Sequence, residues 1–220
     1  MKFITLICGY GVPEDILTDR SYHAYLTTCM NWLFDRCAKT SGAVVLNGGP
    51  TDIFKPYQRT EAGEMAKWIR RKQAEIERTR GEKLPWKIVA KPKSLSSVEN
   101  ILNFKPLTDE TSNVIVFCER TRTARIRRLV KLIFGSRRVT IVPIDFDGSP
   151  RRYQPIRTKQ SERDFIRMET AAVHNRHALK LIRSFMKKKL TLMREHDPVT
   201  AHRLLPKIIE DLHEEFKNSD

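Results

Sequence analysis

The feature that most constrains the fold is a series of short apolar runs, each leading directly into a polar segment. Four such runs lie at residues 4–8, 43–47, 86–90 and 114–118. Apolar runs without polar alternation are typical of strands buried on both faces, as in a parallel sheet. Ligands of open parallel sheets bind outside the carboxyl ends of the strands. The polar segments therefore fall where a ligand is expected to bind.

Stretches with helical spacing of apolar residues separate these runs, so strand and helix alternate along the first two thirds of the chain. The pattern predicts strands near 3–8, 43–47, 86–91, 113–118 and 138–145. It predicts helices near 19–39, 60–80, 97–103 and 121–134. The expected fold is a Rossmann-like α/β three-layer sandwich with a mostly parallel five-stranded sheet and right-handed crossovers.

The pattern changes after Gly148-Ser149-Pro150, where strand signals stop. Two helical stretches follow, near 161–193 and 198–217, and we expect them to form a helical hairpin. The sequence therefore predicts two parts: a Rossmann-like domain over residues 1–150 and a C-terminal helical extension over 151–220 that packs on it.

The chain of 220 residues has a formal net charge of +15, which favours anionic partners such as nucleotides, nucleic acid or acidic membrane surfaces. The charge is uneven. Residues 119–138 hold eight basic side chains and one acid, and residues 151–220 hold sixteen basic and ten acidic side chains.

The remaining composition favours a cytoplasmic protein. None of the four cysteines forms a C-x-x-C pair, which is typical of reduced thiols. The apolar run near the start is too short for a signal peptide, and no apolar stretch reaches 18 residues, so no membrane span is expected. His174 and His177 lack further matching ligands, and no metal site is predicted. No motif of a catalytic nucleophile is present, and the sequence does not decide whether the protein is an enzyme.

Glycines follow the first two predicted strands. Gly9-x-Gly11 is half of a dinucleotide-binding fingerprint without the third glycine, and it is equally compatible with a simple turn. Gly48-Gly49 repeats the arrangement after the second strand, where a ligand can approach the main chain closely. Asp52, just beyond, is either a ribose ligand or a solvated loop residue.

Polar residues also open the second and third predicted helices. Glu61 follows a capping threonine and complements the helix dipole. Ser96 and Glu99 fit a capping box, which follows Ser94. Asn100 has no comparable structural role, and we therefore regard it as a candidate binding residue.

A charged cluster follows the fourth strand. Glu119, Arg122 and Arg125 lie between this strand and its helix. Arginines beside a helix N-terminus oppose the dipole unless an anion or a carboxylate joins them. The cluster indicates either an anionic ligand or arginine–glutamate pairing on a solvated surface.

These motifs together resemble the YdcF-like family of bacteria, over about residues 3–145. The resemblance rests on Gly48-Gly49, on Thr60-Glu61-Ala62, and on Ser94-x-Ser96-Ser97-x-Glu99-Asn100, which is similar to the family's S-x-N-T-x-E-N. It implies a Rossmann-like sandwich and, from YdcF itself, S-adenosylmethionine as a ligand. The SanA and ElyC branches are membrane-anchored envelope proteins without an agreed reaction.

Our first hypothesis is a cytoplasmic protein that binds a nucleotide-like or other anionic small molecule, with S-adenosylmethionine implied by the resemblance. The candidate binding residues are Gly9, Gly11, Gly48, Gly49, Glu61, Ser94, Glu99, Asn100, Glu119, Arg122 and Arg125.

Two alternatives remain. The chain could be a nucleic-acid-associated protein that uses the arginine-rich helix and the basic hairpin, although no aromatic residue interleaves with the arginines of 119–131 as a stacking surface requires. It could also be an envelope factor held by acidic lipid, for which the run 187–189 is short. The direction of Arg122 and Arg125, toward the strand ends or outward, separates these hypotheses. The oligomeric state is undecided.

Overall fold

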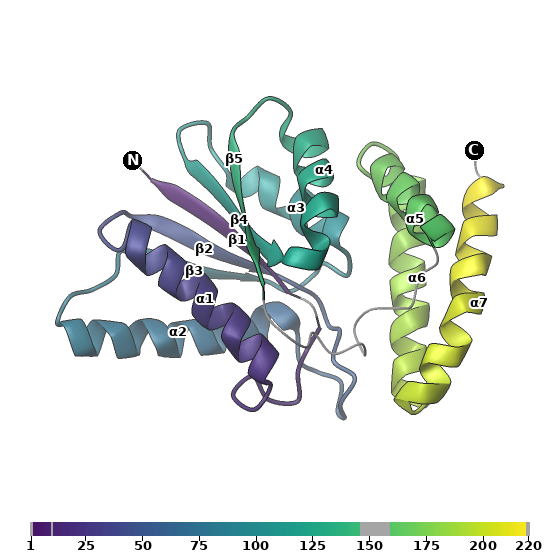
Figure 1. The fold of residues 1–220 in the computed structure, drawn as a ribbon, viewed down its shortest axis with the longest axis horizontal. Helices are drawn as coiled ribbons and strands as arrows, with labels where there is room; N and C mark the ends of the chain where they lie inside the picture. The colour runs from purple at the N-terminus through teal and green to yellow at the C-terminus, as the bar shows by residue number, and fades with distance from the viewer. Residues whose placement is uncertain (1, 10, 146–158, 219–220) are drawn as a thin grey trace. The chain divides into compact units, whose positions relative to one another are not determined.

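The computed structural model describes residues 2–9, 11–145 and 159–218 of the chain (Figure 1). The chain forms two compact units, Met1–Gly148 and Ser149–Asp220.

The first unit is built on a five-stranded sheet in the order β3-β2-β1-β4-β5, and every neighbouring pair is parallel. The strands are β1 (Phe3–Cys8), β2 (Gly42–Asn47), β3 (Trp86–Lys91), β4 (Asn113–Glu119) and β5 (Val139–Ile144). This confirms the predicted α/β fold class. The three inner strands, β2, β1 and β4, have mainly apolar sequences, as burial on both faces of a parallel sheet requires.

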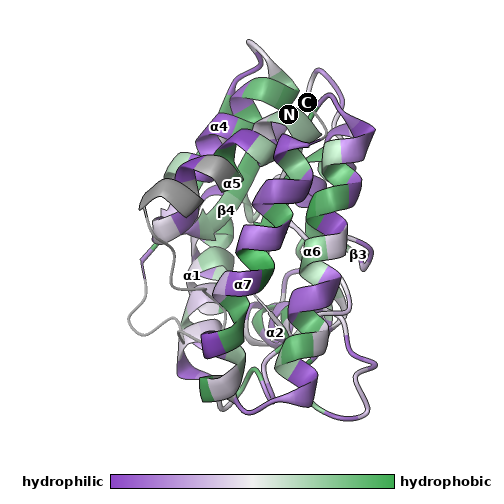
Figure 2. Ribbon diagram, turned by 90° about the vertical axis from the view of Figure 1, so that its right-hand side faces the viewer, coloured by the Kyte–Doolittle hydropathy of each residue, from purple (hydrophilic) through white to green (hydrophobic). Residues whose placement is uncertain are grey.

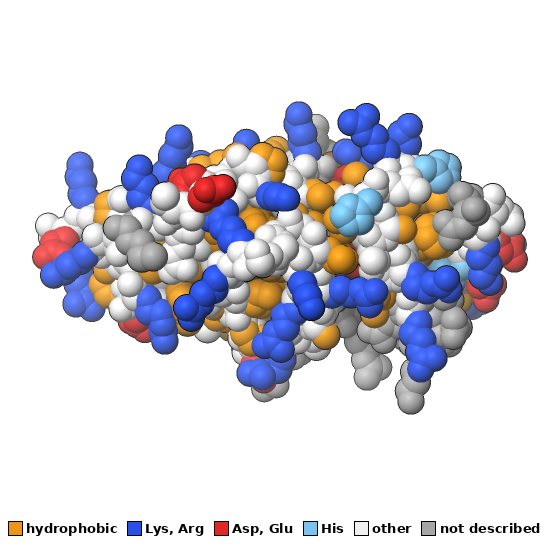
Figure 3. Space-filling model, turned by 90° about the horizontal axis from the view of Figure 1, so that it is seen from above, with side chains coloured by type: hydrophobic (Ala, Val, Ile, Leu, Met, Phe, Trp, Pro, Cys, Tyr) orange, Lys and Arg blue, Asp and Glu red, His pale blue; other side chains and the backbone are white. Residues whose placement is uncertain are grey.

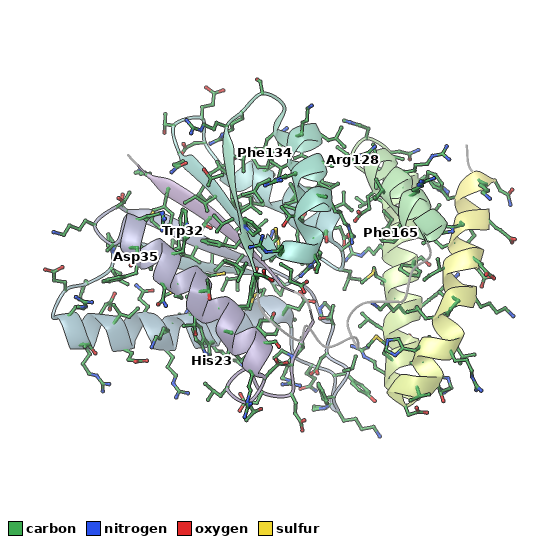
Figure 4. All side chains as sticks on the ribbon, viewed as in Figure 1. His23, Trp32, Asp35, Arg128, Phe134 and Phe165 are labelled. Atoms are coloured by element: carbon green, nitrogen blue, oxygen red, sulfur yellow. The ribbon has the colours of Figure 1, made fainter. Side chains whose placement is uncertain are left out.

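Helices cover both faces of the sheet. They are α1 (Arg20–Cys37), α2 (Glu61–Arg80), α3 (Ser97–Phe104) and α4 (Thr123–Phe134), with 3₁₀ turns at Lys105–Leu107 and Arg120–Arg122. α1 and α2 lie on one side of the sheet, and α3 and α4 lie on the other (Figure 1). On the first side, Trp32 of α1 meets Phe117 of β4 edge to face at 5.4 Å between ring centroids (Figure 4).

Capping residues mark the ends of several helices. The side chains of Asp19, Thr60 and Ser96 accept hydrogen bonds from the first turns of α1, α2 and α3. Gly81 ends α2 with a φ of 70°, a conformation that a side chain disfavours. Local sequence therefore fixes where these helices begin and where α2 ends.

The register brings the carboxyl ends of the central strands level with one another. Cys8 pairs with Asn47 in β2, which in turn pairs with Lys91 in β3. The chain leaves β1 toward β2, but β4 lies on the other side of β1. The edge between β1 and β4 is thus the topological switch point, where ligands of such sheets bind.

The second unit consists of helices in its described residues: α5 (Lys159–Ala172), α6 (Arg176–Glu195) and α7 (Pro198–Lys217). The expected hairpin is therefore wrong in one respect, because the stretch predicted as a single helix over 161–193 is divided. Asn175 interrupts it and caps α6 by accepting from the amides of His177 and Ala178. Figure 2 shows apolar and hydrophilic residues alternating along α6 and α7, as expected for helices that bury one side.

Candidate functional site

Arg122 is the central charged residue of the switch point. Its Nη1 and Nη2 atoms each donate to the carbonyl oxygen of Gly9 at 3.1 Å, and its Nε lies 2.7 Å from Oε2 of Glu119. The side chains are 17% and 4% exposed, respectively. Burial opposes the charged guanidinium, but the Glu119 carboxylate and further acidic groups raise the pKa of Arg122 above its usual range. Arg122 therefore stays charged and joins the ends of β1 and β4.

Glu61 fills the space beside two of the strand-end glycines. A Cβ at Gly9 or at Gly48 would come within 3.1 Å of the Glu61 carboxyl carbon and closer still to its Oε2. Thr51 donates to the other carboxylate oxygen of Glu61 at 2.6 Å. The glycines at the ends of β1 and β2 thus accommodate a buried carboxylate of the protein itself. Their presence needs no ligand to explain it.

The second glycine of the pair has a different neighbour. A Cβ at Gly49 would lie 2.6 Å from the carbonyl oxygen of Ser94 and 3.0 Å from Cδ2 of Leu95. The Ser94 hydroxyl accepts from Nδ2 of Asn103 at 2.8 Å. The segment after β3 therefore packs directly against the main chain after β2. Gly11 is buried and has a φ of 119°, a conformation that favours glycine.

Glu99 occupies the N-terminus of α3. Its Oε2 accepts from the amide of Leu95 at 2.7 Å and from the Ser96 hydroxyl at 3.3 Å, while the Ser96 hydroxyl accepts from the Glu99 amide. This is a capping box displaced by one residue, because the carboxylate bonds the amide before the N-cap. The Glu61 carboxylate also lies in a first helical turn, that of α2, where it accepts from the Thr51 hydroxyl. Carboxylates of the chain therefore already complement two helix N-termini.

The N-terminus of α4 differs from those of α2 and α3. Its first turn contains no acid, and Arg122 at the N-cap makes no side-chain capping bond. Arg125, in the first turn, is half-buried. Of the three helix N-termini at this edge, that of α4 is the one most suited to an anion.

Two buried asparagine amides lie at the β2–α3 side of the same edge. Asn47, at the end of β2, donates from Nδ2 to the main-chain oxygen of Asn100 at 2.7 Å. The side chains are almost fully buried, with residue exposures of 0% and 5%. Among the described residues, the Oδ1 atoms of both have no hydrogen-bond partner. The sequence pointed to Asn100 but not to Asn47, whose only signal was a polar residue ending an apolar run.

Asp52 is neither a solvated loop residue nor open to a ligand. Its side chain is fully buried and pairs with Arg59, with 2.9 Å between Oδ1 and Nη2. Arg59 also donates to the carbonyl oxygens of Pro13 and Glu14 at 2.9 and 2.7 Å. The pair thus ties together the loops after β1 and β2. Sequence reasoning missed Arg59 because it carries no local motif.

Tyr25 of α1 lies beneath the switch point. Its buried hydroxyl is within hydrogen-bond distance of two main-chain oxygens, that of Cys8 at 2.9 Å and that of Phe117 at 3.3 Å. All four cysteines are free and buried. Burial, with the neighbouring Cys118, raises the pKa of the Cys8 thiol to about 12. Cys8 is therefore a neutral small residue here and not a nucleophile.

The structure brings the candidate residues to one edge of the sheet. A chain of contacts runs from Arg122 through Gly9 and Glu61 to Gly48 and Gly49, and then to Ser94. The hydrogen bond from the Asn47 amide to the Asn100 carbonyl connects the first turn of α3 to these contacts. Arg122 is directed toward the strand ends, as the small-molecule hypothesis requires, whereas Arg120, Arg127 and Arg128 are exposed (Figure 4 labels Arg128 on α4).

The described residues contain no group of three His, Cys, Asp or Glu side chains that could hold a metal ion. None of their helices is both long enough and apolar enough to cross a membrane. Comparisons with family models, curated proteins and solved structures give no match to the chain. The resemblance to the YdcF-like family therefore stays a prediction.

Proposed function

We propose that the unit Met1–Gly148 binds a nucleotide-like small molecule at the carboxyl edge of its sheet, between the switch point and the first turn of α3. S-adenosylmethionine is the candidate that the resemblance implies. The observation that carries the proposal is the pair of buried amide oxygens of Asn47 and Asn100, which lack a partner among the described residues.

Buried polar atoms are nearly always hydrogen-bonded, and an unsatisfied one costs about 1–3 kcal/mol. The orientation of the Asn47 amide is set, because its Nδ2 donates to a carbonyl oxygen. Its Oδ1 is therefore a hydrogen-bond acceptor that a donor group of a ligand can satisfy. Ribose hydroxyls and amino groups are such donors, and both occur in nucleosides and in S-adenosylmethionine.

The switch point supplies the complementary half of the site. A guanidinium has five N–H donors, and Arg122 directs two of them to the Gly9 carbonyl. Its Nε lies 2.7 Å from Oε2 of Glu119 but makes no hydrogen bond among the described residues. One N–H on each Nη remains without a partner among the described residues, beside the uncapped first turn of α4. A carboxylate or phosphate fits this place. A ligand with donors at one end and an anion at the other satisfies both halves.

The test is a thermal-shift and calorimetric screen of nucleotides, S-adenosylmethionine and sugar nucleotides. A ligand at 100 times its dissociation constant stabilises the folded state by about 2.7 kcal/mol. Asn100→Ala should weaken binding strongly with little loss of stability. Asn31→Ala, which alters an exposed asparagine of α1, is the matched control and should change neither quantity.

Ser96→Ala separates capping from binding. It removes the N-cap of α3 and should lower the free energy of unfolding by about 1 kcal/mol while affinity is kept. If Asn100→Ala lowers the melting temperature as much as Ser96→Ala and leaves affinity intact, Asn100 is structural and the proposal fails.

A cytoplasmic location and a bacterial origin belong to the same proposal. The four free, buried thiols support the first, because reducing compartments keep such thiols unpaired. Cell fractionation of the tagged chain in a bacterial host tests the location. Recovery in the membrane pellet after a high-salt wash would contradict it.

A further inference from the structure

The helix α6 carries a continuous basic stripe along one side. It holds seven Lys or Arg residues and one acid, Glu195, at its last position. Four of the cations follow helical spacing, at positions i, i+4, i+7 and i+11, and all four are exposed. They are Arg176, Lys180, Arg183 and Lys187, and we call them the α6 stripe. With a rise of 1.5 Å per residue, the stripe extends over about 16 Å.

The packing of the unit leaves this side of α6 uncovered by α5 and α7. Four of the five buried residues of α6 lie roughly 160–240° around the helix from Arg176, at 100° per residue, and the fifth, Leu190, follows the last residue of the stripe by three positions. The four are Ala178, Ile182, Phe185 and Leu192. Phe185 meets Phe165 of α5 at 6.0 Å between ring centroids. The apolar face of α6 is thus used inside the unit, and the stripe points away from it.

Arg183 makes further contacts, so the cations of the stripe that matter for binding are the exposed Arg176, Lys180 and Lys187. The acids of α7 gather near its end, at Glu210, Asp211, Glu214 and Glu215. The described ion pair between the helices joins Glu215 to Lys188, which lies outside the stripe, at 3.1 Å. On the face of the molecule drawn in Figure 3, Lys and Arg side chains are more frequent than acidic ones, in keeping with the net charge of +15.

We propose that the α6 stripe binds the phosphate backbone of a nucleic acid duplex, independently of the small-molecule site. The exposed Arg176, Lys180 and Lys187 can each contact a different phosphate, and such contacts need no aromatic stacking surface. The absence of interleaved aromatics, which argues against single-strand binding, does not bear on a duplex.

A membrane surface is the alternative for any basic helix, and the packing argues against it. An amphipathic helix that lies on a bilayer inserts its apolar face among the lipids. In α6 that face is already buried against Phe165 and the rest of the unit. Only electrostatic attraction would remain, and a duplex offers a denser row of charges.

The experiment measures anisotropy of a labelled DNA or RNA duplex with the full chain, from about 50 mM to about 200 mM salt. The triple variant R176Q/K180Q/K187Q spares Arg183, which makes further contacts. The matched control is R127Q/R128Q/K131Q, which removes the same charge from the exposed side of α4.

Each phosphate contact contributes about −0.9 to the slope of log affinity against log salt for B-form DNA. The α6 variant should therefore flatten the slope by about 2–3, whereas the α4 variant should change it by less than about 1. The charge-preserving variant R176K/K180R/K187R should restore binding, and circular dichroism should show unchanged helicity in all three.

Three results would overturn the proposal. One is an equal loss of duplex affinity in the α6 and α4 variants, which would mean that only the net charge of the protein matters. Another is no binding of the unaltered chain at about 50 mM salt. The third is that R176Q/K180Q/K187Q loses binding to phosphatidylserine vesicles, measured in the same salt range, but keeps its affinity for the duplex.

Discussion

The contact between Gly9 and the Glu61 carboxylate gives the most decisive test of the strand-end structure. Gly9→Ala would place a methyl group where Oε2 of Glu61 lies, with the carboxyl carbon 3.1 Å and the Glu61 Cβ 3.0 Å away. Overpacking of this kind costs about 1–3 kcal/mol. Glu61→Ala removes the hydrogen bond from Thr51, and a bond to a charged group contributes about 1.5–3 kcal/mol.

If the contact is real, the two losses are not additive. In the double variant the methyl group no longer meets a carboxylate, so the combined loss of unfolding free energy should be smaller than the sum by about 1–3 kcal/mol. Urea unfolding followed by tryptophan fluorescence measures this, because Trp32, Trp68 and Trp86 are the only tryptophans and all lie in the first unit.

Gly135→Ala provides the control. A Cβ at Gly135 would meet no atom within 4 Å, although its φ of 63° makes the substitution costly by itself. The loss of unfolding free energy caused by Gly135→Ala should add to the loss caused by Glu61→Ala. Additive losses for Gly9→Ala and Glu61→Ala as well would refute the reasoning, since they would mean that the carboxylate does not occupy the space beside Gly9.

Further predictions concern buried groups. Because burial holds the thiol of Cys8 protonated to about pH 12, while an unfolded thiol ionises near pH 8.5, unfolding free energy should fall as pH rises between these values, by at most about 1.4 kcal/mol per pH unit for this group. In urea titrations across this pH range, the unfolding free energy of Cys8→Ala should fall less steeply with pH than that of the unaltered protein. An unchanged slope would exclude Cys8 as a cause. Arg59→Met removes the guanidinium from the buried Asp52 carboxylate, which keeps the amides of Phe54 and residue 59 as donors, and should destabilise by about 3–5 kcal/mol. Asp52→Asn in the same chain should recover part of this in thermal melts, and no recovery would show that Arg59 acts through its carbonyl contacts alone.

The sequence predicted the fold because strand and helix signals here are local. Unbroken apolar runs identified the strands, and Asp19, Thr60 and Ser96 marked the helix starts as N-caps. The division of the long C-terminal helix was missed because Asn175 interrupts an otherwise continuous apolar spacing, and a single capping residue is a weak signal inside such a pattern.

The candidate site was predictable in position but not in its internal pairing. Topology alone takes residues after parallel strands to one edge. Which groups they meet there depends on residues far apart in the chain. Glu61 filling the space beside Gly9, and Arg59 reaching Pro13 and Asp52, are such cases. No periodicity or spacing rule encodes these contacts.

The hydroxyl of Tyr25 bears on how the molecule fluctuates. It reaches the main-chain oxygen of Cys8, at the end of β1, and that of Phe117 in the neighbouring strand β4, so it joins the two strands that flank the switch point. Local opening between β1 and β4 would leave the Tyr25 hydroxyl buried without its hydrogen-bond partners. The amide protons at these strand ends should therefore exchange only when the whole unit unfolds. Motion at this edge is then left to the loops above the sheet, and a ligand has to enter through them and not between the strands.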